Sequence, residues 1–352
     1  MKNDLPFGKI SPKIFEEIIL PRLGKKRDSV LVGPMNGVDV AIIKVGGKVL
    51  ATTTDPVFIV PNYGWERAAW FAIHILVSDA VTSGLEPKYL TIDLNLPLSI
   101  TREALEIIWK VIHHECEAMG ISIISGHTAR YEGTDFPMVG GATVIAEGDE
   151  DQYITPAMAK PGDKVLITKG AAIEATGLFA ASFPDRITKD FGKEFQKRAD
   201  EYFYKMSVVK EAQLAITIGV RENGVTSMHD ATECGVLGGL YEVAKASNTG
   251  ITIYKDKIPV PDVVQKICDK YEMDPYISIS EGTLIITVKP NKVKALIDLL
   301  ESNDIIVAEI GEITDNKEIT IISNGESTLF KHPETDPFWG AFSKIMSEET
   351  AE

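Results

Sequence analysis

The feature that most constrains the fold is a loop-like break near the middle of the chain, with strand and helix patterns on both sides of it. Pro156 and the run Lys160-Pro161-Gly162-Asp163 are typical of a connection between domains. Neither half shows a clean βαβ pattern, because the strands and helices alternate irregularly. We therefore expect an α+β protein of two domains. The expected parts are an N-terminal domain at 1–155, a C-terminal domain at 156–330 and a C-terminal helix or tail at 331–352.

The charge of the chain limits its partners. It carries 51 acidic and 36 basic residues, a formal net charge of -15. Nucleic acids and anionic membranes attract basic surfaces, so neither is expected as a partner. A polyphosphate would also be repelled, unless divalent cations lay between its phosphates and the carboxylates of the protein.

The apolar segments and the cysteines indicate the compartment. The first 25 residues hold no uninterrupted apolar stretch of the kind found in signal peptides, and 18 apolar residues never run together. Cys116, Cys234 and Cys268 are far apart and odd in number, which fits neither a disulfide framework nor a structural zinc site. We therefore expect a cytoplasmic protein with reduced thiols.

Aspartates at the ends of predicted elements are the main candidates for chemistry. The chain lacks G-x-S-x-G, H-E-x-x-H, Walker A and G-x-G-x-x-G motifs, so common hydrolase, zinc-protease, P-loop and Rossmann functions have no support. Four aspartates instead lie beside Gly, Thr or Pro, namely Asp39, Asp55, Asp79 and Asp230. Singly, Asp230 can cap the next helix and Asp55 can start a turn. As a set they suit Mg²⁺, which binds through a few carboxylates and substrate phosphates.

Two small-residue segments are candidates for binding phosphate. Ser125-Gly126-His127-Thr128 follows a predicted strand at 121–124, and Lys169-Gly170 follows another at 164–168. Glycine lets backbone N–H groups approach phosphate oxygens, and a following helix N-terminus favours the negative charge. An ordinary tight turn is the alternative for each segment. Glu281 opens a strand and is either a polar site residue or a solvated turn carboxylate.

The segments, in this order, resemble the superfamily of AIR synthase, HypE, thiamine-monophosphate kinase and selenophosphate synthetase. Three segments of the first half resemble family motifs: Gly37-Val38-Asp39-Val40-Ala41, Thr53-Thr54-Asp55-Pro56-Val57 and Val77-Ser78-Asp79 with Gly84 and Pro87. Ser125-Gly126-His127-Thr128 resembles the G-G-[DEH]-T turn. The second half adds Gly162-Asp163-Lys164-Val165, Met228-His229-Asp230-Ala231-Thr232 and Ser280-Glu281-Gly282-Thr283-Leu284. The similarity spans residues 30 to 290.

The resemblance implies two PurM-like domains. The N-terminal one has a mixed sheet that forms a barrel across a homodimer, the C-terminal one is an α/β sandwich, and Mg-ATP lies between the halves. Family members use ATP to phosphorylate an amide oxygen, a phosphate or selenide. The implied metal ligands are Asp39, Asp55, Asp79 and Asp230. The implied catalytic residues are Asp55, Asp230 and His127, and the implied ATP-binding residues are Gly126, Thr128, Lys169, Gly170, Thr232 and Glu281.

Departures from the family pattern narrow the expected function. His127 stands where kinase members have an aspartate. HypE ends in a cysteine that accepts a carbamoyl group, whereas no cysteine follows Cys268 in this sequence. Selenophosphate synthetase needs a cysteine near its N-terminus, whereas none precedes Cys116 here. We expect a HypE-like enzyme of the hydrogenase maturation type that activates an amide, carboxyl or phosphate oxygen by phosphoryl transfer from Mg-ATP. Two alternatives are a small-molecule kinase of the thiamine-monophosphate kinase type and a non-catalytic nucleotide-binding scaffold in a maturation complex. The acceptor is an unidentified small molecule or protein-borne group.

Overall fold

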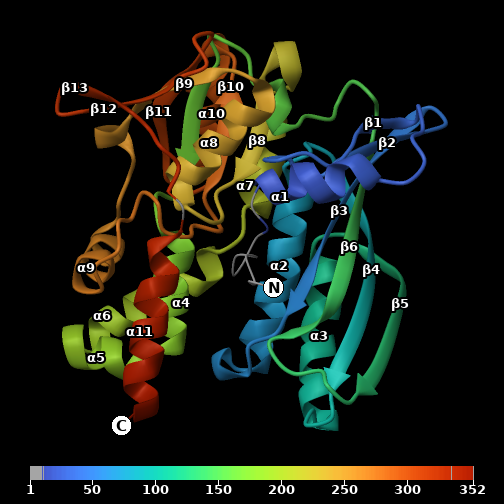
Figure 1. Cartoon of the computed structure of the whole chain (residues 1–352), viewed down its shortest axis with the longest axis vertical. Coiled ribbons are helices and arrows are strands. Elements are labelled where there is room, and N and C mark those ends of the chain that lie inside the picture. Colours follow the sequence, from blue (N-terminus) through green and yellow to red (C-terminus); the bar gives the residue numbers. More distant parts are fainter. Residues whose placement is uncertain (1–9, 11, 334, 352) are drawn as a thin grey trace.

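A six-stranded sheet organises the first half of the chain (Figure 1). The computed structural model describes residues 10, 12–333 and 335–351. The strand order is β1-β2-β3-β6-β4-β5, and only β4 and β5 pair in parallel. The strands are β1 (Val30–Val32), β2 (Ala41–Val45), β3 (Lys48–Phe58), β4 (Glu86–Pro97), β5 (Ser122–Tyr131) and β6 (Met138–Gly148).

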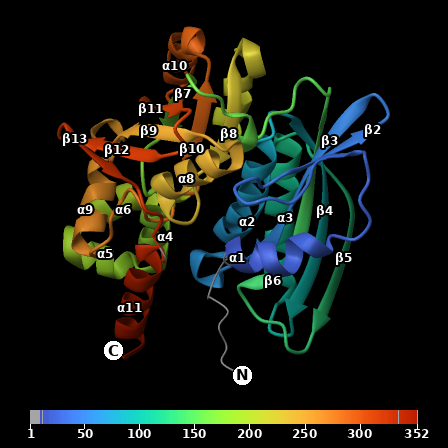
Figure 2. The same ribbon diagram turned by 45° about the horizontal axis from the view of Figure 1, so that its top comes forward.

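Two helices cover one face of this sheet, α2 (Trp65–Val81) and α3 (Arg102–Ala118), as Figures 1 and 2 show. Small residues such as Ala68, Ala69 and Ala72 are buried on α2 and let it lie close to the strands. The start of α3 is capped by Thr101, whose hydroxyl accepts a 3.1 Å hydrogen bond from the Ala104 N–H. A short helix, α1 (Pro12–Ile14), precedes the sheet.

The second half holds a seven-stranded sheet in the order β13-β12-β9-β11-β7-β10-β8. Its neighbours pair antiparallel, except β12 with β9. Three adjacent strands, β7, β10 and β8, are almost entirely buried. The bounds are β7 (Lys164–Thr168), β8 (Val225–Asp230), β9 (Gly250–Tyr254), β10 (Leu284–Val288), β11 (Val307–Thr314), β12 (Ile319–Ser323) and β13 (Glu326–Leu329).

Helices surround this second sheet. They are α4 (Ile173–Ser182), α5 (Pro184–Phe191), α6 (Lys193–Asp200), α7 (Val209–Ile216), α8 (Gly235–Ser247), α9 (Asp262–Lys270) and α10 (Val293–Glu301). The C-terminal α11 (Pro337–Ala351) begins where the Asp336 carboxylate accepts a 2.8 Å hydrogen bond from the Phe338 N–H. The Phe338 ring packs edge-on against Phe179 of α4, with centroids 5.6 Å apart, so α11 is joined to the body of the second half.

Helix α2 also belongs to the core of the second half. One buried apolar cluster contains Leu76 and Val77 of α2 together with Val208, Val225 and Leu284. The Ser78 hydroxyl accepts a 3.1 Å hydrogen bond from the Val208 N–H. At the other end of α2, Arg67 forms an ion pair with Asp200 at 2.6 Å. The two halves are therefore packed against a shared helix.

The α+β class and the mixed sheet predicted for the first half are confirmed, and the sheet of the second half is mixed as well. One local prediction is wrong: residues 125–128 do not form a turn but continue β5, paired with β4 as far as Tyr131. The glycine there serves close packing, because a Cβ at Gly126 would lie 2.2 Å from the Ile92 carbonyl oxygen. None of the described helices is both long and apolar enough to cross a membrane.

Candidate metal and nucleotide site

Five carboxylates from both halves converge at the seam between the two sheets. Their mutual repulsion shows that they are close: burial raises the pKa of Asp79 well above its usual value, and the charges of the other four raise it further. Asp79 lies on α2, and the remaining members of this acidic cluster are Asp39, Asp55, Asp230 and Glu281. The four aspartates predicted from the sequence thus meet in the fold.

Strand β3 and helix α2 fix the first two carboxylates. The Thr53 hydroxyl donates a buried 3.1 Å hydrogen bond to Asp79, which holds that carboxylate against the strand. Asp55 follows two residues later on the same strand, so its side chain points to the same face of the sheet as Thr53. Asp55 and Asp79 are therefore neighbours across the packing of α2 on the sheet.

A tight turn places Asp39. Gly37 in this turn has φ +74°, and a Cβ on it would lie 2.8 Å from the Glu242 carbonyl oxygen of α8. Only glycine permits both the left-handed backbone and the close approach. The turn of the first half is thereby docked on a helix of the second half, and Asp39 reaches the seam.

His229 lies between two carboxylates. Its Nδ1 is 3.1 Å from Asp39 Oδ2 and its Nε2 is 2.8 Å from Glu242 Oε2, while the side chain is buried. Burial alone disfavours the imidazolium, but the neighbouring carboxylates of Asp39 and Glu242 raise the pKa of His229 well above its usual value. His229 therefore lies where an imidazolium would bridge Asp39 and Glu242, and its ring lies against the Asp39 carboxylate. The sequence left its role ambiguous.

Asp230 and Glu281 are the deepest members of the acidic cluster. They are brought together because Asp230 ends β8 opposite Leu284 of β10, three residues after Glu281. Both Asp230 oxygens and Glu281 Oε2 are buried without a hydrogen-bond donor in the described part of the chain. Burial, and then the Asp230 charge, raise the pKa of Glu281 well above its usual value. Glu281 is thus buried within the acidic cluster and is not a solvated turn carboxylate.

Two further acids border the acidic cluster and were not singled out from the sequence as site residues. Glu174 of α4 accepts a 3.0 Å hydrogen bond from the Glu281 N–H, and desolvation raises its pKa to about 8. Asp336 accepts a 2.7 Å hydrogen bond from the Cys234 N–H, and burial raises its pKa to about 6. In the sequence, an aspartate before a predicted helix and a glutamate in the first turn of a helix are both common features that do not by themselves indicate a site.

The donor atoms of the acidic cluster fit Mg²⁺. Buried carboxylates without donors are costly unless a cation or protons neutralise them. Oxygen donors suit a hard divalent cation. One ligand atom each from Asp39, His229 and Asp230 lies within 4.8 Å of the others. Because both nitrogens of His229 already face carboxylates, the aspartates are the better candidates for ligands.

Three candidates on β5 lie apart from the acidic cluster within the chain. Gly126, His127 and Thr128 are exposed on the edge strand, and His127 Nε2 is 2.9 Å from the Tyr131 hydroxyl. Strand β5 is three steps from β3, which carries Asp55, or about 14 Å at the usual strand spacing. The structure therefore does not bring His127 together with Asp55 and Asp230 in one chain.

The other candidates flank Glu281. Thr232 accepts a 3.2 Å backbone hydrogen bond from the Ser280 N–H. Lys169 and Gly170 have φ of 60° and 117° after β7, and the Gly170 carbonyl accepts a 2.6 Å hydrogen bond from the Thr283 hydroxyl. The Lys169 ammonium turns toward Glu211 at 2.7 Å. This loop therefore packs directly on the turn that carries Glu281.

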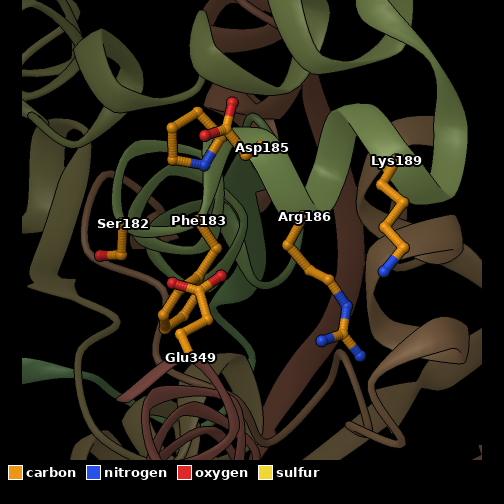
Figure 3. A pocket seen from close by; sticks show the side chains of 7 residues that line it. Ser182, Phe183, Asp185, Arg186, Lys189 and Glu349 are labelled. Carbon is orange, nitrogen blue, oxygen red and sulfur yellow. The ribbon is translucent and has the colours of Figure 1, made fainter. Parts of the chain in front are cut away.

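Two cavities open on the second half. One of about 470 Å³ is lined by Lys169 together with residues of α2 and of 202–211. The other, of about 400 Å³, lies beside α5 and α11 (Figure 3). Its Arg186 forms ion pairs with Asp190 and Glu348 at 3.4 and 3.1 Å. No member of the acidic cluster lines this second cavity.

Comparison with known proteins gives a consistent family. Sequence models of AIR synthase related proteins match in two parts, the N-terminal domain over residues 37–158 and the C-terminal domain over 160–324. A Methanocaldococcus jannaschii protein named for hydrogenase expression/formation is 26% identical over 298 residues, covering 84% of each chain. A selenide, water dikinase of Haemophilus influenzae is 26% identical over 350 residues, covering 89% of this chain and 93% of its own. The solved structure of HypE in the HypE–HypF complex superposes with a TM-score of 0.70 at 22% identity, covering 91% of this chain and 99% of its own.

Proposed function

The chain belongs to the family of AIR synthase related proteins, and on that premise we propose that it transfers a phosphoryl group from Mg-ATP to an oxygen of an acceptor. The observation that carries the proposal is the acidic cluster, in which buried carboxylate oxygens of Asp230 and Glu281 have no donor. Such a cluster must hold either protons or cations, and the divalent cations that suit its oxygen atoms also bind triphosphates. A HypE solved with ATP, 20% identical, shares the fold at a TM-score of 0.67.

Each part of the site has a role in this reaction. Asp39, Asp55, Asp79 and Asp230 would hold Mg²⁺, which when bound would neutralise the triphosphate charge. Thr53 and His229 orient two of these carboxylates. The acceptor oxygen forms a bond to the γ-phosphorus, the bond from that phosphorus to the β,γ-bridging oxygen breaks, and ADP leaves. Catalysis is then chiefly positioning and charge neutralisation.

We place this activity in the HypE-like, hydrogenase maturation type, where the acceptor is an amide or carboxyl oxygen. Relatives named for hydrogenase expression/formation and carbamoyl dehydratase support that assignment, at 26% and 23% identity. A small-molecule kinase is the second candidate, favoured both by the cavity of about 470 Å³ that Lys169 lines and by a thiamine-monophosphate kinase of Aquifex aeolicus at 24% identity. In that case the acceptor oxygen belongs to a phosphate.

We also propose that the protein is a homodimer and that its partner subunit supplies the β5 residues of the nucleotide site. β5 is an unpaired sheet edge, and Ile124 and Tyr131 on it, with Met138 of β6, are 54%, 43% and 59% exposed. A second copy laid on this edge would cover them and bring Gly126, His127 and Thr128 to a site. Light scattering that shows a monomer at micromolar concentration contradicts this arrangement.

The test of the activity is ATP turnover with acceptors that carry amide, carboxyl or phosphate oxygens. We expect Mg²⁺-dependent turnover that is lost in Asp55→Asn and Asp230→Asn and kept in Asp151→Asn, an exposed aspartate outside the acidic cluster. Tight binding of Mg-ATP without turnover on any acceptor would identify a nucleotide-binding scaffold instead. Failure of ATP to bind with Mg²⁺ present would refute the proposal.

A further inference from the structure

The cavity of about 470 Å³ next to the acidic cluster collects positive charge in an acidic protein. We call it the lysine cavity, lined among others by Trp70, His74, Lys169, Tyr204, Lys205 and Lys210. Glu211 and Asp304 are the acidic residues of its wall. Three ammonium groups against two carboxylates give the wall a net positive charge, in a chain whose formal net charge is -15.

Two of the three ammonium groups are available to a ligand. Lys169 is paired with Glu211 at 2.7 Å, whereas Lys210 donates a 2.9 Å hydrogen bond to the Asn303 carbonyl. The Lys205 ammonium lies 3.9 Å from the centroid of the Tyr202 ring. Among the described residues, no carboxylate lies within ion-pair distance of Lys205 or Lys210. An anion in the lysine cavity would therefore find two ammonium partners.

The ammonium groups of these lysines also repel one another, and this repulsion destabilises the protein when no anion is bound. Burial, assisted by Lys210, lowers the pKa of Lys169, although Glu211 opposes the change. Burial also lowers the pKa of Lys205, and the charge of Lys169 lowers it further. A bound anion would relieve this repulsion and favour the charged forms.

One wall of the lysine cavity is flat and aromatic. The Trp70 ring stacks on His74 with centroids 4.1 Å apart and an interplanar angle of 23°, and Tyr204 meets Trp70 edge-on at 5.1 Å. His74 is held by Ser207 at 2.8 Å and Glu115 at 3.1 Å. This wall suits the organic part of a small molecule, and the volume is in the range of small-molecule sites.

The lysine cavity is built on the same backbone segments as the acidic cluster. A Cβ on Gly282, the residue after Glu281, would lie 2.1 Å from the Lys205 carbonyl oxygen. The Lys169 ammonium donates a 2.6 Å hydrogen bond to the Ser207 carbonyl, and the next N–H, that of Val208, donates to Ser78 beside Asp79. The two sites are therefore adjacent.

We propose that the lysine cavity binds the acceptor substrate, a small organic anion whose carboxylate or phosphate group lies on Lys205 and Lys210 while its apolar part lies on Trp70. This inference rests on the proposed function, since it assigns the second substrate of the same phosphoryl transfer. It limits acceptors to molecules that carry an anionic group besides the oxygen that is phosphorylated, or whose phosphate supplies that oxygen.

Calorimetric titration of the full chain with phenyl phosphate, benzoate and inorganic phosphate tests this inference, with Mg-ATP titrated separately. We expect phenyl phosphate or benzoate to bind more tightly than inorganic phosphate. Lys205→Gln and Lys210→Gln should each weaken that binding about tenfold or more, because each removes one charge-assisted hydrogen bond. Lys294→Gln, a matched change of an exposed lysine on α10, should not alter it. Preference for phenyl phosphate indicates a phosphorylated acceptor, and preference for benzoate a carboxylic acid.

The outcomes separate the two proposals. If none of the three probes binds at millimolar concentration while Mg-ATP does, the acceptor site is refuted and the proposed function stands. If Mg-ATP binding falls in Lys205→Gln and Lys210→Gln as much as probe binding does, the lysine cavity belongs to the nucleotide and the inference is overturned. If the probes bind but Mg-ATP does not, the proposed function fails, and with it the acceptor role of the cavity.

Discussion

The hydroxyl of Thr53 donates a 3.1 Å hydrogen bond to the carboxylate of Asp79, across the contact between β3 and α2. Both residues are buried, with exposed fractions of 4% and 7%. Asp79 is also the carboxylate on which the charges of the other four members of the acidic cluster act. The neutral Thr53 hydroxyl therefore donates to a carboxylate that four other carboxylates repel.

Replacing Thr53 with Val should destabilise the protein by about 1–3 kcal/mol, because a buried carboxylate loses a donor while the shape of the side chain is kept. Thr53→Ser should restore most of the loss. Thr54→Val, on the exposed face of the same strand, is the control. Urea unfolding measures the difference, and equal stability of Thr53→Val and the wild type would contradict the role given to this hydrogen bond.

Replacing His229 with Gln should cost about 3–5 kcal/mol, the usual effect of removing one partner of a buried ion pair. Asp39 and Glu242 would then face each other without a cation. The raised pKa of His229 means that its stabilisation is complete below pH 6.5 and is lost as the pH rises through the value in the folded protein. Unfolding of His229→Gln and of the exposed control His114→Gln, compared at one neutral pH, measures the effect. A loss no larger than that of the control counts against a buried imidazolium.

Without divalent cations, the melting temperature should fall as the pH rises from about 4 to 8, because the pKa values of Asp336 and Glu174 are raised to about 6 and about 8 in the folded protein. Carboxyls with raised pKa bind more protons in the folded than in the unfolded state. Their contribution to stability is therefore complete below the unfolded pKa and is lost as the pH rises through the folded one. Mg²⁺ should reduce this fall in melting temperature, because a bound cation neutralises the carboxylates in place of the protons.

Thermal melts in EDTA and in Mg²⁺ provide the measurement. Glu174→Gln should reduce the pH dependence of the melting temperature in EDTA, because glutamine does not ionise whereas Glu174 has a pKa of about 8. A melting temperature in EDTA that is constant or rises over this range would show that Glu174 and Asp336 do not hold extra protons in the folded chain.

Replacing Gly282 with Ala should weaken both the fold and the binding of phenyl phosphate to the lysine cavity. Its φ is +97°, and the new Cβ would collide with the Lys205 carbonyl oxygen. Gly162→Ala separates the two effects, since Gly162 has φ +91° with open space around it. We expect about 1 kcal/mol from backbone strain alone at Gly162 and a larger loss, with weaker probe binding, at Gly282. Equal losses and unchanged binding would show that Lys205 is placed independently of this contact.

Elements that are defined by the residue pattern within their own segment could be predicted from the sequence. The strand predicted at 164–168 appears in the structure as β7, and the strand predicted at 121–124 is the beginning of β5. The four aspartates could be found as a set because each lies at or near the end of an element, where side chains from different elements can meet. Their ligand roles stay predictions.

What the sequence did not predict depends on contacts between distant segments. Ser125-Gly126-His127-Thr128 has the composition of a turn, yet its glycine is required by the backbone of Ile92 on the neighbouring strand. The lysine cavity joins α2, the loop after β7 and residues near 205, which no local pattern connects. Glu174 borders the acidic cluster only because α4 packs on the turn that carries Glu281.

Helix α2 has a consequence for how the molecule can be divided. It contributes to an apolar cluster that includes residues of both halves, and its Ser78 and Arg67 are bonded to Val208 and Asp200 of the second half. A gene fragment encoding residues 1–155 alone would expose that side of α2 to water, and we expect such a fragment to aggregate. The two sequence matches thus mark units of shared ancestry, whereas we expect the undivided chain to be the cooperative folding unit.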